Sequence, residues 1–392
     1  MSYKVTPNRV AISLTNSSFW GQSSTIPMSV EKGVYALLNE ARFVLSLSWT
    51  ITGGTPALTI TRPPIAWINT ANTTIEYETG NGQTVTENYS TQSNRGDVGY
   101  LLELMDLSYS GWEDANALEN LTVPYTPPGN TAATGKFEVC IPFRYIIDPC
   151  ISKKYLPIKT FVFQPNWRSL LDVMAPSATA GVTGFTVTVN SFYVDYNTVE
   201  ILPSPSAELK LPDLRGIYIL PLNRVAGDTQ TSVTIAIPGK PRYLYHFFLS
   251  SGTNPGAGGT NSTYLFNTLS GTAGAGATTQ SIITYQQCSI GGKTFPLNPQ
   301  YGSTAVDDVN AYTGLSHLYH EWQVQTNNFM SGNDTRLTFA DYRDKTKIYA
   351  IDLSAVDTDY ATFQFNAQYS PLKLPTNTTS MSHIIFVIYA IK

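Results

Sequence analysis

The sequence repeats one structural plan in its two halves. In each half, β-rich runs lead into one amphipathic helix headed by aspartate, and further β-rich runs follow. The first predicted helix follows Asp97 and the second begins at Asp307, so the two starts are separated by about half of the 392 residues. A single hydrophobic core stops growing beyond roughly 250–300 residues. The repetition therefore predicts two similar domains in tandem.

The residue types favour sheets over helices. The chain is 12% aromatic and only 13% charged, and Gly, Pro, Thr, Ser and Asn fill the gaps between apolar runs, a composition typical of strands joined by turns. Apolar residues alternate within 34–51, which predicts a half-buried strand. In the last predicted strand, 383–391, both faces are apolar. We expect that strand to be covered on both sides, packed against another domain or subunit.

One helix interrupts the predicted strands of each half. In the first, predicted for 98–107, Asp97 stands where it would cap the first amides, and the apolar stripe has four members: Val98, Leu101, Leu102 and Met105. In the second, predicted for 307–322, the stripe has five: Val309, Tyr312, Leu315, Tyr319 and Trp322. The segment 252–277 is rich in Gly, Ala, Thr and Asn and predicts a long exposed loop.

Charge and cysteine usage limit the partners and the compartment. The net charge of −4 is spread without blocks, so no sequence-specific nucleic-acid binding is expected. Residues 1–13 lack the apolar core of a secretory signal, and the longest apolar run, 384–391, is shorter than the roughly 20 residues that span a bilayer. The odd set Cys140, Cys150 and Cys288 lacks metal-ligand spacing, which predicts free thiols in a reducing compartment.

Three groups of residues are candidate sites. His317 and His320 beside Glu321 lack both the spacing of a zinc hydrolase and a third ligand. Six aspartates offer no carboxylate pair with a defined partner for glycoside hydrolysis: Asp307, Asp308, Asp341, Asp344, Asp357 and Asp359. The adhesion-type tripeptide Arg95, Gly96, Asp97 is better explained by the helix that follows it. The sequence thus predicts no enzyme and no catalytic, cofactor-binding or metal residues.

The order of elements resembles a known family of viral proteins. The run 282–284, the turn 291–296, the helix 307–322 and the strand 348–354 are similar to the C-terminal domain of double jelly-roll major capsid proteins. Those proteins build the shells of virophages, Polinton-like viruses, adenoviruses and tailless membrane-containing phages. In the first half, 140–143 followed by 156–158 resembles a strand pair of the family's first jelly roll. The resemblance implies an all-β fold of two tandem eight-stranded jelly-roll β-sandwiches, each with a short helix inserted between strands.

The resemblance also implies an assembly. It predicts a major capsid protein whose homotrimers form pseudo-hexagonal capsomers (hexons) of an icosahedral dsDNA-virus shell, made in the host cytoplasm and located in the virion. The implied partners are neighbouring capsomers, penton or vertex proteins, minor capsid proteins and a possible internal membrane. The expected domains are an N-terminal arm at 1–28, a first jelly roll at 29–205, a linker at 206–230 and a second jelly roll at 231–392. Expected outer loops are 78–95, 252–277 and 327–336.

Two other functions stay open at this point. Tandem sandwiches also occur in lectins and carbohydrate-active proteins, because a fold does not determine a function. A minor capsid or vertex protein of the same kind of virus is the other alternative.

Overall fold

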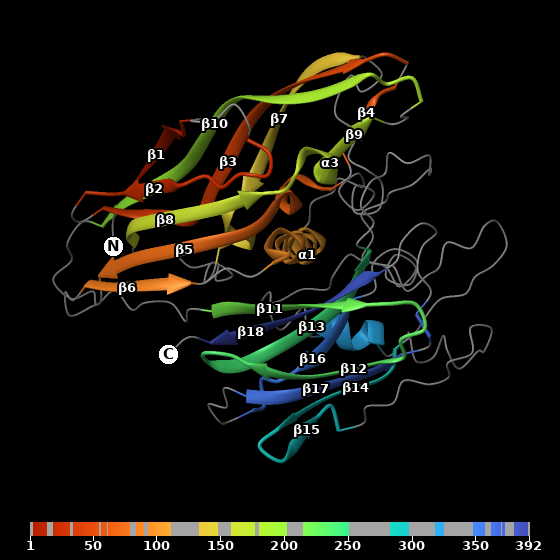
Figure 1. The fold of residues 1–392 in the computed structure, drawn as a ribbon. Helices are drawn as coiled ribbons and strands as arrows, with labels where there is room; N and C mark the ends of the chain where they lie inside the picture. Colours follow the sequence, from red (N-terminus) through yellow and green to blue (C-terminus); the bar gives the residue numbers. More distant parts are fainter. Residues whose placement is uncertain are drawn as a thin grey trace. The chain divides into compact units, whose positions relative to one another are not determined.

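Two compact units make up the described part of the chain. The computed structural model describes residues 3–13, 19–31, 34–54, 56–60, 62–78, 84–89, 93–110, 133–147, 158–176, 180–201, 215–250, 283–297, 318–324, 348–356, 362–369, 371–372 and 380–390. Strands β1 to β10 belong to the first unit and β11 to β18 to the second (Figure 1). Among these residues no helix is long and apolar enough to cross a membrane.

The first unit contains ten described strands, three short helices and the first half of a longer helix, α1. The strands are β1 (Tyr3–Ala11), β2 (Ile26–Ser29), β3 (Val34–Thr52), β4 (Leu58–Ile60), β5 (Ile68–Glu78), β6 (Thr84–Tyr89), β7 (Thr134–Pro142), β8 (Ile158–Trp167), β9 (Met174–Pro176) and β10 (Gly184–Ile201). The helices are η1 (Pro64–Trp67), α1 (Arg95–Ser110), η2 (Phe143–Tyr145) and α3 (Leu170–Val173). The predicted helix at 98–107 is therefore confirmed.

Eight of these strands form two antiparallel rows. One row has the order β1-β10-β3-β7 and the other β2-β8-β5-β6, and the two are linked in one sheet path only by the pair Ala36 and Ile158. The short strands β4 and β9 pair with each other. When the eight strands are lettered B to I in chain order, the rows read B-I-D-G and C-H-E-F. This strand order defines a jelly roll.

Aromatic side chains fill the space between the two rows. Phe43 of β3 lies 5.6 Å from Phe163 of β8 between ring centroids, and Trp167 of β8 meets Phe192 of β10 edge-on at 5.7 Å. All four side chains are at most 2% exposed. Offset and edge-on pairs at these distances are the favoured aromatic geometries. The first core is therefore a sandwich core held by side chains from both rows.

The second unit has the same topology. Its strands are β11 (Arg215–Arg224), β12 (Gln230–Ala236), β13 (Lys240–Ser250), β14 (Ile283–Ile290), β15 (Lys293–Phe295), β16 (Tyr349–Asp352), β17 (Thr362–Tyr369) and β18 (Met381–Ala390). The two sheets have the orders β11-β18-β13-β16 and β12-β17-β14-β15. Lettered in the same way, they again read B-I-D-G and C-H-E-F. The prediction of an all-β chain with two jelly-roll sandwiches is confirmed.

The helices also occupy equivalent places. α1 lies between β6 and β7, and the helical residues 318–324 lie between β15 and β16. Both positions fall between strands F and G. Leu318 and Trp322 are fully buried. Trp322 is a member of the apolar stripe predicted for this helix, so its burial agrees with the prediction. Residues 307–317 lie outside the described part of the chain.

The last strand, β18, is buried on both faces. Ile385, Val387 and Tyr389 belong to the core cluster of the sandwich, while Ile384, Phe386 and Ile388, which point the other way, are fully buried too. The prediction of a strand covered on both sides is confirmed.

The expected boundaries differ from the structure at three places. The arm expected at 1–28 contains β1 and β2, which pair with β10 and β8 as strands B and C of the first jelly roll. The linker expected at 206–230 contains β11, with Ile217 and Ile219 buried. The outer loop expected at 78–95 contains β6, paired with β5.

The strand β1 carries no sequence signal of its own. It ends its row, and most of its described side chains are exposed, so no apolar alternation identifies it as a strand. The other two expected loops, 252–277 and 327–336, lie outside the described residues.

Candidate functional site

The tripeptide Arg95, Gly96, Asp97 lies at the start of α1 and is buried. Arg95 is 4% exposed and Asp97 is fully buried, whereas an adhesion ligand must be exposed. α1 begins at Arg95, so Asp97 lies inside its first turn. The predicted helix-cap position of Asp97 is therefore wrong, and the adhesion reading fails for this arrangement.

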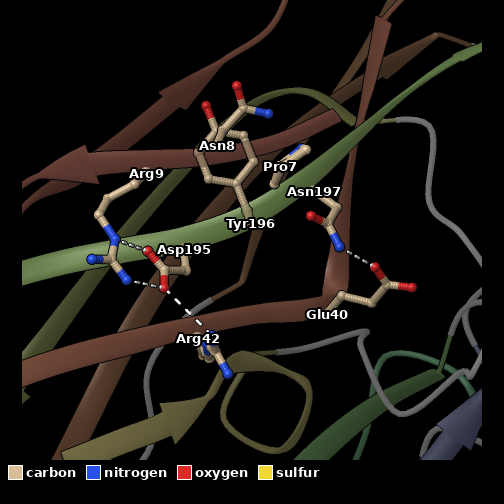
Figure 2. A pocket seen from close by; sticks show the side chains of 8 residues that line it. All are labelled: Pro7, Asn8, Arg9, Glu40, Arg42, Asp195, Tyr196 and Asn197. Atoms are coloured by element: carbon tan, nitrogen blue, oxygen red, sulfur yellow. Dashed lines mark hydrogen bonds and ion pairs between the residues drawn. The ribbon is translucent and has the colours of Figure 1, made fainter. Parts of the chain in front are cut away.

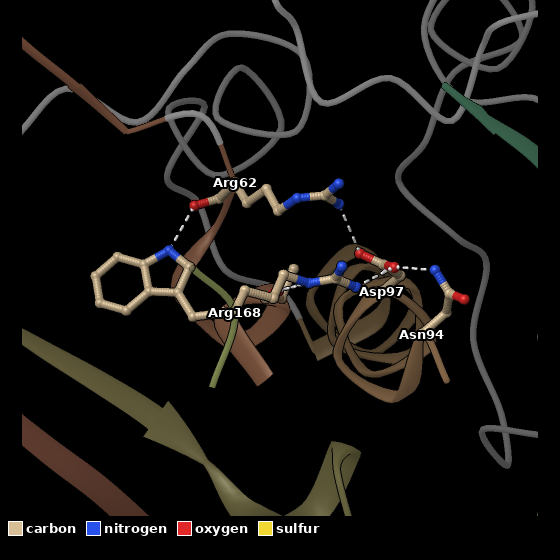
Figure 3. Close-up of polar contacts among 6 residues, drawn as sticks. Arg62, Asn94, Asp97 and Arg168 are labelled. Carbon is tan, nitrogen blue, oxygen red and sulfur yellow. Dashed lines mark hydrogen bonds and ion pairs between the residues drawn. The ribbon is translucent and has the colours of Figure 1, made fainter. Parts of the chain in front are cut away.

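Asp97 instead joins two arginines from distant parts of the chain (Figure 3). Arg62 Nη1 donates to Oδ1 at 3.1 Å, and Arg168 Nη2 donates to Oδ2 at 2.6 Å. Asn94 Nδ2 also donates to Oδ2, at 2.8 Å. The side chains of the two arginines are only 13% and 9% exposed. The carboxylate thus compensates two guanidinium groups that are nearly removed from water.

The surrounding backbone explains why this cluster forms. Trp67 Nε1 donates to the carbonyl of Arg62 at 2.8 Å, and Arg168 Nε donates to the carbonyl of Ala66 at 2.9 Å. A Cβ atom at Gly96 would overlap the carbonyl oxygens of Ile65 and Ile68, so only glycine lets α1 approach η1 this closely. The cluster connects η1, α1 and the end of β8, and its role is structural.

The other candidates chosen from sequence are not brought together. His320 is exposed on the helix 318–324 and Glu321 follows it, while His317 lies outside the described residues. The six candidate aspartates also lie outside them. Across the described ranges, no group of three or more His, Cys, Asp or Glu side chains is placed to hold a metal ion.

Two of the three cysteines are described, and both are free thiols. Cys140 on β7 is exposed and Cys288 on β14 is buried. Burial raises the pKa of the Cys288 thiol because it disfavours the thiolate. Cys288 therefore behaves as a small apolar side chain of the core.

A polar recess of about 440 Å³ lies on the first unit where β1, β10 and β3 run side by side (Figure 2). Eight residues line it: Pro7, Asn8, Arg9, Glu40, Arg42, Asp195, Tyr196 and Asn197. Arg9 holds Asp195 in a two-pronged pair, with Nε to Oδ1 at 2.6 Å and Nη2 to Oδ2 at 2.7 Å. Arg42 Nη2 lies 3.6 Å from Asp195 Oδ2. Asn197 Nδ2 donates to Glu40 Oε2 at 2.6 Å.

The charges of the recess compensate one another. The hydrogen bond and the positive charge of Arg9 hold the pKa of the Asp195 carboxyl below its usual range, and the same pair raises the pKa of Arg9. A glycosidase needs the opposite, a carboxyl with a raised pKa that acts as general acid. The guanidinium side chains of Arg9 and Arg42 are 58% and 55% exposed. The recess therefore suits salt-sensitive surface contacts better than catalysis.

A second polar group, missed from sequence, lies inside the second unit. His246 on β13 and His383 on β18 are fully buried and hydrogen-bonded to each other at 2.9 Å. The sequence signal for their burial is the alternation of side chains along each strand. His246 lies on the same strand face as Leu244 and Phe248, and His383 on the same face as Ile385, and these faces point into the core. The alternation placed His383 on an apolar face but gave no partner for it.

Two jelly rolls of one topology in a single chain define the double jelly-roll fold. Solved structures with the same fold include the Faustovirus major capsid protein, which is 8% identical, with a TM-score of 0.57 over 100% of this chain and 90% of that chain. A chain from the cryo-EM structure of the Sputnik virophage is 13% identical, with a TM-score of 0.56 over 99% of this chain and 85% of that chain. No protein-family model and no curated protein matches the sequence. The chain thus has the double jelly-roll fold found in viral major capsid proteins, as its sequence predicts.

Proposed function

We propose that the chain is a structural major capsid protein of an icosahedral viral shell. The observation that carries the proposal is the tandem pair of sandwiches, each with the order B-I-D-G and C-H-E-F. The likeness to the Faustovirus major capsid protein supports it, because it extends over the whole of this chain and nearly the whole of that one.

The proposed unit of assembly is a homotrimer. Three copies supply six jelly rolls, which together make a pseudo-hexagonal capsomer. Its proposed partners are neighbouring capsomers, penton or vertex proteins, minor capsid proteins and a possible internal membrane. The protein acts by packing in the virion after synthesis in the host cytoplasm, without catalysis and without reading a nucleic-acid sequence.

The end strand of the first unit fits a protein that works at high local concentration. β1 is the last strand of its row in the described structure, and it carries Lys4, Pro7 and Arg9. Charged residues and proline at a sheet edge oppose the addition of a foreign strand. The same edge is held in register by the Arg9 and Asp195 pair across β1 and β10. Such an edge favours ordered assembly over aggregation.

The mass and outline of the purified chain test the proposal. Light scattering should give three times the 43.0 kDa mass of one chain, and negative-stain images of the same peak should show a pseudo-hexagonal outline. Co-expression with the remaining capsid genes of its source should place the chain in closed shells. A chain that stays monomeric, is left out of shells and binds on a glycan array would instead support the lectin alternative. A chain found only at the vertices of shells would support the minor capsid alternative.

A further inference from the structure

The two buried histidines belong to a chain of hydrogen bonds that crosses the core of the second unit. Six groups from six strands take part in this histidine chain: Tyr369 (β17), Thr231 (β12), His383 (β18), His246 (β13), Gln286 (β14) and the carbonyl of Ala350 (β16). The successive separations are 3.0, 2.8, 2.9, 2.8 and 3.1 Å. β12, β14 and β17 belong to one sheet and β13, β16 and β18 to the other. The chain therefore passes between the sheets three times.

The hydrogen bonds of the chain have one self-consistent direction. Gln286 Nε2 donates to the carbonyl of Ala350, so its Oε1 is the acceptor that faces His246. His246 must then carry its proton on Nε2 and accept at Nδ1. For the same reason, His383 carries its proton on Nε2 and accepts at Nδ1. The Thr231 hydroxyl donates to His383 and accepts from Tyr369.

Both imidazoles are neutral in this arrangement, and the surroundings favour that state. Their side-chain partners are neutral, and aromatic rings cover them: Phe248 stacks on His383 at 4.1 Å and Tyr349 on His246 at 5.0 Å between ring centroids. Burial lowers the pKa of His383, and the positive charges of His246 and of Arg224 on β11 lower it further. Asp228 and Arg224 act on Tyr369 at the end of the chain. The other buried titratable groups on these strands are Tyr245 (β13), Cys288 (β14), Tyr349 (β16) and Tyr389 (β18).

A proton from solvent breaks this order. A protonated imidazole has two N–H donors and no acceptor. If His246 gains a proton on Nδ1, that N–H faces the N–H of His383. Reversal of the donors from His383 to Tyr369 would restore the hydrogen bonds, but a cation would remain enclosed among aromatic and apolar side chains, which is strongly unfavourable. Opening of the sandwich is the way to hydrate the charge.

We propose that the histidine chain is a proton-sensitive lock between the two sheets of the second jelly roll, closed while both imidazoles are neutral and released when acid protonates them. The lock goes beyond the proposed capsid function and is a property of the single chain, so it stands or falls independently of assembly. In a shell, it would confine acid-induced loosening to the second jelly roll.

The direction of the pH effect follows from the two states. Burial lowers the pKa of His246 from 6.5 to about 4, and burial with the neighbouring charges lowers the pKa of His383 well below 6.5. In the unfolded chain both groups titrate near 6.5. The unfolded state therefore binds more protons below that pH, and the stability from the lock, complete above about pH 6.5, falls as the pH falls towards 4.

Hydrogen exchange of the full-length protein tests the lock, because peptides from the two units report separately on local opening. His246 and His383 have a pKa near 6.5 only in the opened state, where water reaches them. Lowering the pH from about 7.5 to 5.5 therefore raises the equilibrium constant for local opening roughly a hundred-fold. Protection factors in β13 and β18 should fall by that amount, and those in β3 and β10 of the first unit should not follow.

Variants assign the effect to the two rings. His383→Gln keeps an N–H donor towards His246 and removes one titrating group, so the fall should shrink to about tenfold. His320→Asn changes an exposed histidine outside the chain and should leave the hundred-fold fall intact. If His383→Gln does not fold, ring-nitrogen NMR of the wild type decides the matter. Two histidines that stay neutral with the proton on Nε2 at about pH 5.5 support the lock.

Two results would overturn the proposal. One is protection in β13 and β18 that changes less than twofold across this pH range. The other is titration of the buried rings near pH 6.5 in the folded protein. Either result leaves the capsid proposal untouched, because trimer mass and shell incorporation are measured separately.

Discussion

The two jelly rolls share one strand order but satisfy their buried polar groups in opposite ways. The first encloses an ion cluster in which Asp97 compensates Arg62 and Arg168. The second encloses the histidine chain, in which every member is neutral. Strand order follows from apolar alternation and strand pairing. Neither determines which polar side chains occupy the few polar positions of the core. The two units should therefore respond differently to loss of a charge and to a change of pH.

The largest expected effect is the loss of the acid in the first unit. Asp97→Asn removes the negative charge that the nearly buried guanidinium groups of Arg62 and Arg168 share, and removal of one partner from such a cluster costs about 3–5 kcal/mol. Denaturant unfolding followed by exchange of peptides from β5 and β8 measures the loss. Glu138→Gln, at an exposed position of β7, is the control and should change little. An effect of Asp97→Asn below about 1 kcal/mol would show that the cluster is not compensating buried charge.

The second effect is the pH response of the second unit. A shift of the His246 pKa from 6.5 to about 4 corresponds to roughly 3 kcal/mol between the protonation states. Because the folded pKa lies below the unfolded one, this stability is present at neutral pH and is lost as the pH falls from about 6.5 to 4. Unfolding curves at several pH values, read through β13 and β18, measure it. Equal pH slopes in the two units would remove the contrast between them.

A third effect comes from cutting the histidine chain without adding charge. Gln286→Leu leaves the His246 N–H and the carbonyl of Ala350 without their partner, and a buried unsatisfied group costs about 1–3 kcal/mol. Unfolding at neutral pH measures the loss in the second unit. Gln364→Leu, at an exposed position of β17, is the control. Equal stability of Gln286→Leu and the wild type would mean that the chain does not hold the sheets together.

A substitution at Gln286 can give the second unit a buried carboxylate like that of the first unit. Gln286→Glu places a carboxylate next to His246 Nε2, and an opposite charge at hydrogen-bond distance raises the pKa of an imidazole. The acid-induced loss of protection should therefore shrink from about a hundred-fold to about tenfold, because only His383 keeps its lowered pKa. Exchange between about pH 7.5 and 5.5 measures the change. An unchanged pH slope would exclude direct coupling between the two side chains.

Sequence patterns predicted what depends on neighbours in the chain and missed what depends on distant pairing. Alternation and helical spacing identified β3, β18 and α1, because each carries its own apolar face. β1 was missed, since its pairing with β10 supplies the order that its own residues do not show. Asp97 was placed near the right helix but given the wrong role, because Arg62 and Arg168 reach it only in the folded unit. His246 and His383 come from strands 137 residues apart, so no local pattern pairs them.

The smallest expected effect concerns the polar recess of the first unit. Arg9 is 58% exposed, and ion pairs in contact with water contribute little to stability, so Asp195→Asn should hardly change the stability of the chain at neutral pH. The pKa of Asp195 is lowered chiefly by Arg9, so what stability the pair gives is present above the unfolded pKa and lost as the pH falls through the folded one. Unfolding curves for Asp195→Asn and Arg9→Gln measure the contribution of the pair to the free energy of unfolding.

If these variants unfold as the wild type does but give trimers or shells with a weaker dependence on salt, the recess acts in assembly. If they lower stability by several kcal/mol, the exposed pair would be as important as the buried cluster at Asp97, and burial would no longer explain the difference between them.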